Sequence, residues 1–310
     1  MDTDMDTIRT AAPRRHVTPS AAALSAAALC LACAGIARAA DVATAGSPVE
    51  PAPAAEAGGA IPDAPLPGAA FEVKVGAVSF NMRWCPPGSF TMGSPVSEDG
   101  RDTDEVQHKV TLTKGFWIGE TEVTQALWRE VLGANPAHHK GDDLPVEQVT
   151  WNDCQRFLRK LNTRPEVRDA KLAFSLPTEA QWEYACRSGT AGPFAGEGFL
   201  DDMGWCNSNS GGSSHPVARQ APNEWGIYDM HGNVWEWCSD WFGDYPKTGQ
   251  SDPTGPSSGV LRVARGGSWI HPARSCRAAF REWYAPGDRD ASLGLRLVLA
   301  AGPGQGDEPR

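Results

Sequence analysis

The hydrophobic pattern after residue 70 begins as a two-residue alternation. Phe71, Val73 and Val75 are apolar and are separated by charged residues, which predicts a half-buried strand. Short runs at residues 89–92 and 110–118 predict two further strands, and a polar, acidic segment between them predicts a loop. The domain is therefore expected to open with three strands.

Apolar positions then recur every three to four residues in three segments, which is the spacing of amphipathic helices. Thr121, Thr150 and Thr178 precede these segments and are candidate N-caps. Gln181 lies three residues after Thr178, which completes a capping box, and Gly189 is placed to end that helix. The middle of the chain is therefore predicted to form three helices.

Beyond Gly189 the pattern becomes irregular. Gly, Asn and Ser are dense up to residue 214, and neither an internal repeat nor a heptad pattern is present. Four short strand-like runs, separated by Gly- and Pro-rich stretches, lie at residues 234–237, 262–264, 276–280 and 293–299. The whole pattern predicts an α+β fold that is rich in irregular loops.

The N-terminus has the pattern of an export signal. A basic stretch at residues 14–16 precedes an apolar run at 21–36, and Ala-Arg-Ala at 37–39 is a candidate cleavage site. We therefore predict a signal peptide at residues 1–39 and a periplasmic or secreted location. A wrongly assigned start is the alternative, and the residues before Cys33 fit a lipoprotein signal less well.

The remaining boundaries follow from composition. Residues 40–68 are rich in Ala, Pro and Gly, which predicts a flexible linker. Residues 69–301 have the composition of one globular domain, and residues 302–310 are predicted to form a disordered tail.

The formal net charge of the chain is −10. Nucleic acids and anionic membranes bind surfaces rich in Lys and Arg, so this charge argues against both kinds of partner. No transmembrane helix is predicted after signal cleavage. We expect a peptide, protein or glycan partner in the cell envelope.

Cysteine usage permits disulfides but argues against a zinc ribbon or a thioredoxin-like motif, because no two cysteines form a C-x-x-C pair. The cysteines that follow the signal are Cys85, Cys154, Cys186, Cys206, Cys238 and Cys276. Their even number suits an exported chain, and the spacing alone does not select a pairing.

Eight segments of the chain form an ordered set of motifs. Examples are Leu-Pro-Thr-Glu-Ala-Gln-Trp-Glu-Tyr at residues 176–184 and Arg-Gly-Gly-Ser-Trp at 265–269. The full set lies at residues 84–94, 120–124, 144–151, 176–184, 222–230, 231–237, 265–269 and 293–296. In order and spacing these segments resemble the formylglycine-generating enzyme (sulfatase-modifying factor) family. The resemblance covers residues 70–301 and implies that family's variant of the C-type lectin-like fold.

The resemblance implies a chemistry for which this chain lacks the key residues. Founding members oxidise a sulfatase cysteine to formylglycine with copper and oxygen, and they use two cysteines. The first family position, three residues after Ser268, is His271 here, and Cys276 is the only cysteine near the second. Copper is therefore not expected, because a soft Cu(I) ion is held by a pair of thiolates. His271 and Cys276 remain the catalytic candidates; His271 as an ordinary loop residue is the alternative.

Calcium is implied more directly. The family holds one calcium ion through a side-chain oxygen, two carbonyls and a Glu, which match Asp229, the carbonyls of Gly232 and Val234, and Glu236. Oxygen ligands from one short loop suit a hard cation. The alternative is that the two carboxylates only cap the loop through backbone hydrogen bonds.

The family's substrate groove is implied at four positions. Ser268 and Arg281 match its Ser and Arg, Trp269 is expected to border it, and Ser292 stands where sulfatase-modifying members have Asn. A buried ion pair is the alternative role for Arg281. The resemblance also suggests that Cys276 packs against Cys186 or forms a disulfide with it.

These residues leave three functional hypotheses open. The first is an exported, diverged protein-modifying or oxidative enzyme, that is, an oxidoreductase of this family without the thiol pair. The second is a non-catalytic, calcium-stabilised binding module, and the third is a true formylglycine-generating oxidase with rearranged thiols. A cavity surrounded by His271, Arg281 and an acid would favour the enzyme, whereas a shallow groove capped by Trp269 and Trp283 would favour binding.

Overall fold

The computed structural model describes residues 65–196 and 199–300, which belong to the second of two compact units, residues 51–310. The predicted signal peptide, the linker up to residue 64 and the tail therefore lie outside the described residues. None of the helices in the described ranges has the length and the apolar character that a membrane crossing requires.

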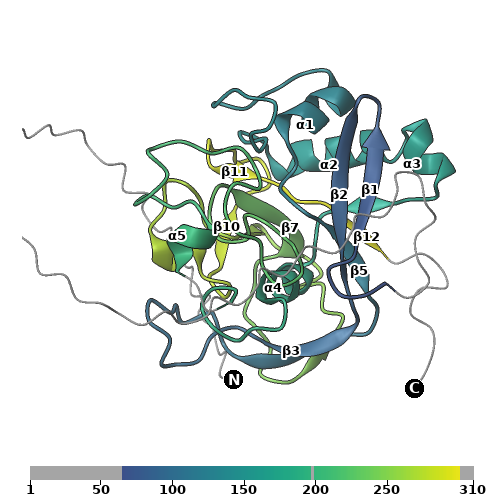
Figure 1. The fold of residues 1–310 in the computed structure, drawn as a ribbon. Helices are drawn as coiled ribbons and strands as arrows, with labels where there is room; N and C mark the ends of the chain where they lie inside the picture. The colour runs from purple at the N-terminus through teal and green to yellow at the C-terminus, as the bar shows by residue number, and fades with distance from the viewer. Residues whose placement is uncertain (1–64, 197–198, 301–310) are drawn as a thin grey trace, which may run out of the picture. The chain divides into compact units, whose positions relative to one another are not determined.

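The largest sheet is five-stranded, in the order β1-β2-β5-β12-β6. Its strands are β1 (Ala70–Val75), β2 (Val78–Cys85), β5 (Phe116–Gly119), β12 (Val298–Ala300) and β6 (Phe174–Ser175). β1 and β2 form an antiparallel hairpin, and β12 pairs with both β5 and β6. The last strand of the domain thereby joins segments that are far apart in the sequence (Figure 1).

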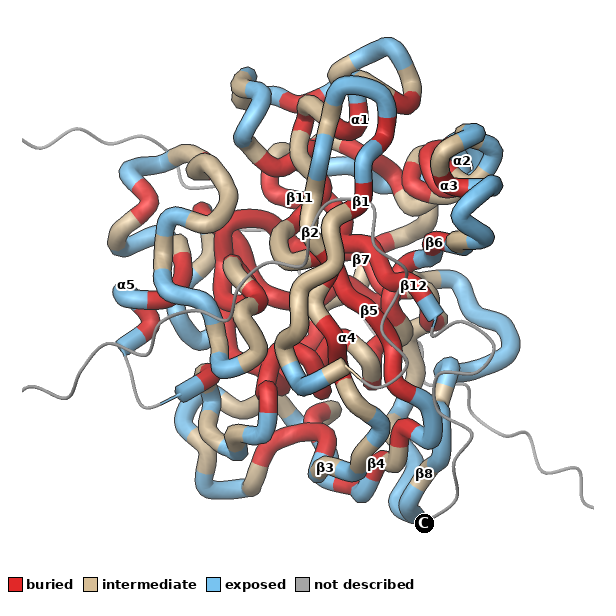
Figure 2. The backbone as a smooth tube through the Cα atoms, turned by 45° about the vertical axis from the view of Figure 1, so that its right-hand side comes forward, coloured by how far each residue is buried: buried red, intermediate tan, exposed pale blue. Residues whose placement is uncertain are grey.

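Most of the candidate functional residues lie in the loops next to the strands of the two smaller sheets. The first sheet has the order β10-β9-β7-β11, with strands β10 (Glu282–Tyr284), β9 (Arg262–Arg265), β7 (Trp235–Trp241) and β11 (Leu293–Gly294). The second has the order β3-β4-β8, with strands β3 (Gly88–Met92), β4 (His108–Leu112) and β8 (Gln250–Ser251). Figure 2 shows β7 as buried, whereas β8 runs along the exposed edge.

The helices are short, and the three longest begin with a side-chain cap. They are α1 (Gln125–Leu132), α2 (Trp151–Leu161), α3 (Pro165–Asp169), α4 (Glu179–Arg187), α5 (Leu200–Met203) and the 3₁₀ helix η1 (Ala273–Cys276). The capping boxes at Thr150 and Thr178 form, the second with Gln181 as predicted. α4 ends at Ser188, which adopts the left-handed conformation one residue before Gly189.

Tryptophan contributes much of the core. Trp117, Trp128, Trp182, Trp235 and Trp237 are among the largest fully buried side chains. One hydrophobic cluster joins the β1–β2 hairpin to α1 and α2, and another surrounds α4. The core thus positions β7 and α4, the two elements on which the candidate sites are built.

Several element predictions needed correction. The strand expected at residues 110–118 is two strands, β4 and β5, and β2 was not foreseen. The first helix begins at Gln125, and Thr124 rather than Thr121 accepts the capping hydrogen bond, from the Leu127 N–H. The cause is tertiary: Thr124 forms a β-bridge with Pro145, which holds the preceding residues extended.

The strand expected at residues 276–280 does not form. The carbonyls of Ala278, Ala279 and Phe280 accept hydrogen bonds from the guanidinium group of Arg265, and the Ala278 N–H donates to the carbonyl of Pro193. A buried arginine therefore satisfies backbone groups that a neighbouring strand would otherwise have to satisfy.

Candidate functional site

The Gly-Gly-Ser loop, residues 266–272, follows β9 directly. Gly267 has a φ of 78°, and a Cβ atom there would lie 2.5 Å from Sγ of Cys276. Only glycine fits this close approach without strain. The tight turn places Ser268 beside His271, with 2.6 Å between Oγ and Nδ1.

Hydrogen bonding fixes the protonation of this pair. The indole N–H of Trp235 can only donate, and it reaches Nδ1 of His271 at 3.2 Å. That nitrogen is therefore an acceptor, so the Ser268 hydroxyl must be the donor in the 2.6 Å contact. The result is a serine hydroxyl aimed at an unprotonated imidazole nitrogen. Ser268 itself is fully buried, which keeps the hydroxyl away from solvent.

Trp269 and Ser292 lie next to this pair. The Trp269 indole N–H donates to the carbonyl of Ala291, and the ring packs edge-on against His139 at 5.1 Å between centroids. The carbonyl of Ser292 accepts the backbone N–H of Trp235, whose indole bonds His271. Ser268, Trp269, His271 and Ser292 therefore lie close together in the fold. The groove expected from the resemblance combined Ser268, Trp269 and Ser292 with Arg281 instead.

Cys276 packs in the interior. Its side chain is fully buried in a small cluster with Leu200 and Cys206, and burial raises the pKa of its thiol far above the usual range. The suggested bond to Cys186 is not formed, because all six cysteines of the described residues are free thiols. His231 lies between the two: its Nε2 is 3.7 Å from the Cys186 thiol, and its Nδ1–H donates to the Cys276 carbonyl.

These residues do not fit a Cu(I) ion. The site would need two accessible thiolates, and burial disfavours the thiolate of Cys276. His271 supplies an imidazole whose Nδ1 already accepts two hydrogen bonds. No step through copper can be built on this pair.

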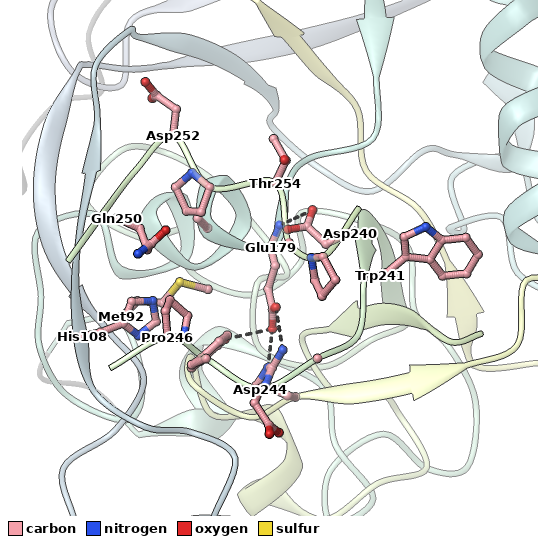
Figure 3. A pocket seen from close by; sticks show the side chains of 17 residues that line it. Met92, His108, Glu179, Asp240, Trp241, Asp244, Pro246, Gln250, Asp252 and Thr254 are labelled. Atoms are coloured by element: carbon pink, nitrogen blue, oxygen red, sulfur yellow. Dashed lines mark hydrogen bonds and ion pairs between the residues drawn. The ribbon is translucent and has the colours of Figure 1, made fainter. Parts of the chain in front are cut away.

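Arg281 lies elsewhere, at the floor of a cavity of about 360 Å³. Its guanidinium group donates from Nε and Nη2 to the two oxygens of Glu179, at 2.6 and 2.9 Å. The Tyr245 hydroxyl donates to the same carboxylate, and Arg281 stacks on the Tyr245 ring (Figure 3). The predicted alternative, a buried ion pair, is therefore correct for Arg281.

The electrostatics of this floor are strongly coupled. Burial alone would raise the pKa of Glu179, but the Arg281 and Arg265 guanidinium groups hold it below the usual range. Burial, followed by repulsion from Glu179, raises the pKa of neighbouring Asp240 to about 7. We call this cavity the acidic pocket; Ser268, Trp269 and His271 are not among the residues that line it.

The predicted calcium loop lies against the Gly-Gly-Ser loop. The Gly232 N–H donates to the carbonyl of Gly266, and Val234 is buried just before β7. Both carboxylate oxygens of Glu236 accept two donors each, from Arg296 and Trp182. Three N–H groups supply these contacts, with Arg296 Nε shared by both oxygens, so this carboxylate is already satisfied and is a poor ligand for a cation.

Asp229 is bonded differently. Its Oδ2 accepts the Ala218 N–H, which matches the loop-capping alternative, while its Oδ1 is buried without a partner. Oε1 of Glu122, a residue with no predicted role, is likewise buried and unpartnered. Burial raises the pKa of Asp229 to about 6 and that of Glu122 well above its usual range, and the nearby carboxylates add to both shifts.

The unpartnered oxygens of this cluster, Oδ1 of Asp229 and Oε1 of Glu122, are the atoms here that suit a hard cation. Within the described ranges no group of three or more His, Cys, Asp or Glu side chains is arranged to hold a metal, so carbonyl oxygens would have to complete the shell. The calcium site stays a prediction, with Asp229 and Glu122 as its fitting carboxylates.

Comparison with known proteins supplies the family. The sequence profile described as a sulfatase-modifying factor enzyme 1-like domain matches residues 76–301. The chain belongs to the sulfatase-modifying factor family. A solved structure, the Treponema denticola variable protein 1, is 31% identical, with a TM-score of 0.69 over 75% of this chain and 99% of that one. The predicted C-type lectin-like variant of the α+β class is thereby confirmed.

Two curated relatives of this sulfatase-modifying factor domain have different names. The chaperone protein LppX of Paenibacillus barcinonensis is 31% identical, over 61% of this chain and 81% of its own length. The formylglycine-generating enzyme of Streptomyces coelicolor is 36% identical over 59% of this chain. The match spans 60% of that enzyme's length, so its activity bears on this chain only as a proposal.

Sequence reasoning missed the residues that surround Arg281. Glu179 lies within a quoted motif, but nothing in the spacing links it to an arginine 102 residues away. Asp240 and Tyr245 carried no signal beyond their charge and aromatic character. Glu122 also lies in a quoted motif, and only the fold reveals its unpartnered oxygen.

Proposed function

We propose that this domain binds a peptide segment of a partner protein and does not oxidise cysteine. One observation carries the proposal: at the family's first thiol position stands the imidazole of His271, which accepts the Ser268 hydroxyl, and the nearby Cys276 is fully buried. Arg281 and its acid border a cavity that His271 does not line. This cavity therefore lacks the arrangement of His271, Arg281 and an acid that would favour an enzyme.

A relative named as a chaperone supports a protein partner. Ile270 lies between Trp269 and His271 in the Gly-Gly-Ser loop. Its side chain is 46% exposed, so it can offer an apolar contact to a partner. An exported location remains part of the proposal, and cell fractionation of the native chain tests it.

The decisive test has two arms. In the first, the purified domain is incubated with copper, oxygen and a peptide carrying Cys-x-Pro-x-Arg, and mass spectrometry follows the cysteine. We expect no formylglycine. Conversion that Cys276→Ala abolishes would overturn the proposal in favour of a rearranged oxidase.

In the second arm, random peptides displayed on phage are selected on the immobilised domain. We expect enriched peptides that lose binding to Ile270→Asp and keep it with Val260→Asp, a matched change at another exposed apolar residue. Failure to enrich any peptide, or equal loss with both variants, would refute the peptide-binding role.

A protein-modifying enzyme is the second candidate, and the Ser268–His271 hydrogen bond favours it. A hydroxyl that donates to an imidazole base is the arrangement that activates a serine nucleophile. The burial of Ser268 weighs against it. Labelling of Ser268 by a fluorophosphonate probe, absent in Ser268→Ala, would favour the enzyme; we expect no labelling.

We also propose that calcium stabilises the domain through Asp229 and Glu122. These buried carboxylates carry more negative charge than Arg296 can balance, and bound calcium would neutralise the rest. We expect that calcium added back to chelator-treated wild type raises the melting temperature, and that Asp229→Asn loses this increase. An equal increase in both proteins would contradict this assignment.

A further inference from the structure

The acidic pocket is formed by segments that no motif marks as a binding site. Its walls come from the end of β7, the loop at residues 243–256, the first turn of α4 and the strands β3 and β4. Its volume of about 360 Å³ falls in the range of small-ligand sites, roughly 300–1,000 Å³. A ligand of this size matches one long side chain or a small free molecule.

The floor of the pocket repels anions. Arg281 is the one arginine among the described residues that line the pocket, and no lysine lines it. The guanidinium group is already used by Glu179, by the Asp104 carbonyl at 3.3 Å and by stacking on Tyr245. It therefore has little capacity left to attract a negatively charged ligand.

Asp240 supplies an unused acceptor. The residue is 3% exposed and lines the cavity. Its Oδ2 accepts the Glu179 N–H at 3.0 Å and the Ser239 hydroxyl at 2.9 Å, while Oδ1 has no hydrogen-bond partner among the described residues. Gly255 permits this arrangement, because a Cβ there would lie 3.1 Å from Oδ1. Oδ1 of Asp240 is not one of the fully buried unpartnered oxygens of the described residues, so it is accessible from the cavity and can accept a hydrogen bond from a ligand that displaces water.

The rim of the pocket adds negative charge. Asp244 and Asp252 are both exposed and line the opening, where Figure 3 shows Asp244 and Asp252 on opposite sides of Glu179. Asp252 is held in place by the backbone N–H and the hydroxyl of Thr113. With the Glu179–Arg281 pair neutral, these two carboxylates give the rim a negative field that attracts cations, and Asp240 adds to it above its pKa of about 7.

Flat aromatic and apolar surfaces complete the wall. Tyr245 packs against His108 at 4.7 Å between centroids, and both line the cavity with Met92 and Trp241. Such surfaces suit the alkyl stem of an organic cation better than a fully hydrated metal ion.

We propose that the acidic pocket binds a hydrogen-bonding organic cation, a primary ammonium or guanidinium group, with Asp240 Oδ1 as its main acceptor. The group either belongs to a small free amine or projects from a Lys or Arg side chain of a peptide. This site is separate from the Gly-Gly-Ser loop, so the inference holds whether or not the peptide proposal above is correct.

The test is a calorimetric titration of the intact domain at low ionic strength. The probes are n-butylguanidinium, n-butylammonium and the neutral isostere n-butylurea. A second pair, blocked Gly-Arg-Gly and Gly-citrulline-Gly, distinguishes a peptide side chain from a free amine. We expect the cations to bind and the neutral analogues not to bind. If the free cations bind more tightly, the natural ligand is a small amine; if Gly-Arg-Gly binds more tightly, it is a peptide side chain.

Three variants sharpen the result. Asp240→Asn keeps the shape and an acceptor but removes the charge, and it should weaken cation binding about tenfold or more, as expected for a lost charge-assisted hydrogen bond. Asp252→Asn at the exposed rim should weaken it only about two- to threefold and reduce the salt dependence. Asp201→Asn, exposed on α5 outside the pocket, is the matched control and should have no effect.

Absence of cation binding to the folded wild type, or equal binding of butylurea, would overturn the proposal. So would unchanged affinity in a folded Asp240→Asn protein. If that variant does not fold, amide chemical shifts of the wild type decide: shifts at Thr254 and Gly255 support the site, and shifts confined to residues outside the pocket refute it.

Discussion

The Gly-Gly-Ser loop and the acidic pocket use polar side chains in opposite ways. In the loop, the polar contacts are uncharged: Ser268 and the Trp235 indole both donate to His271. In the pocket, ionised groups from distant segments meet, and Asp240 keeps an oxygen without a donor. The Gly-Gly-Ser loop is thus tightly packed, whereas most of the residues that line the cavity lie outside the motifs. Motif density and open binding space are therefore separate properties of this fold.

Breaking the ion pair at the pocket floor should have the largest effect. Glu179→Gln leaves the Arg281 guanidinium buried without a full counter-charge, and removing one partner of a buried pair costs about 3–5 kcal/mol. Chemical denaturation of both proteins measures the loss. A double variant, Glu179→Gln with Arg281→Met, should recover part of it. A single variant as stable as the wild type would show that the floor is not held by charge.

A substitution in the loop should be the next most damaging. Gly267→Ala adds a methyl group at a φ of 78°, next to Sγ and the backbone of Cys276. Strain and overpacking together should cost about 2–3 kcal/mol. Thermal melting checks this, with Gly211→Ala as the control, because a Cβ there meets nothing within 4 Å although φ is also positive. Equal losses would mean that backbone conformation alone, and not the contact with Cys276, closes the loop.

The pH dependence of stability should distinguish the pocket from the loop. The pKa of Asp240 is raised in the folded state to about 7, so its contribution favours folding at acid pH and is lost as pH rises from about 4 through 7. Asp240→Asn removes this titration and should therefore gain about 2 kcal/mol relative to the wild type between pH 5 and pH 8. Urea unfolding at both pH values measures the difference. A stability difference between Asp240→Asn and the wild type that stays the same at both pH values would contradict the assignment.

Removing the Ser268 hydroxyl should have the smallest effect. Ser268→Ala deletes one neutral hydrogen bond, and Nδ1 of His271 still accepts the Trp235 indole, so the loss should be about 1 kcal/mol. The same denaturation experiment provides the value. A loss as large as that of Glu179→Gln would mean that the loop, like the pocket, depends on charge.

Local chemistry was enough to predict the elements whose ends are set by neighbouring residues. The capping boxes at Thr150 and Thr178 involve atoms three residues apart, and both helices begin where the sequence places them. The strand expected at residues 276–280 failed for the opposite reason. Its carbonyls bond Arg265, a residue that no local rule links to them.

The same contrast between local and long-range contacts applies to the candidate site. The order of the motifs identified the family, and the residue three positions after Ser268 revealed that the first thiol is missing. Ser268, Trp269 and His271 are close in the fold because they are consecutive or nearly consecutive residues of one tight glycine turn. These conclusions depend on residues that are close in the chain, where covalent geometry limits the possibilities.

Only the tertiary structure decided which groups are buried, charged or left without a partner. It buries Cys276, pairs Arg281 with Glu179, saturates Glu236 through Arg296, and leaves single oxygens of Asp229 and Asp240 unpartnered. Protonation and hydrogen bonding depend on burial and on charges brought together from distant segments. Spacing along the chain contains none of that information, which is why the acidic pocket emerged from the fold and not from the sequence.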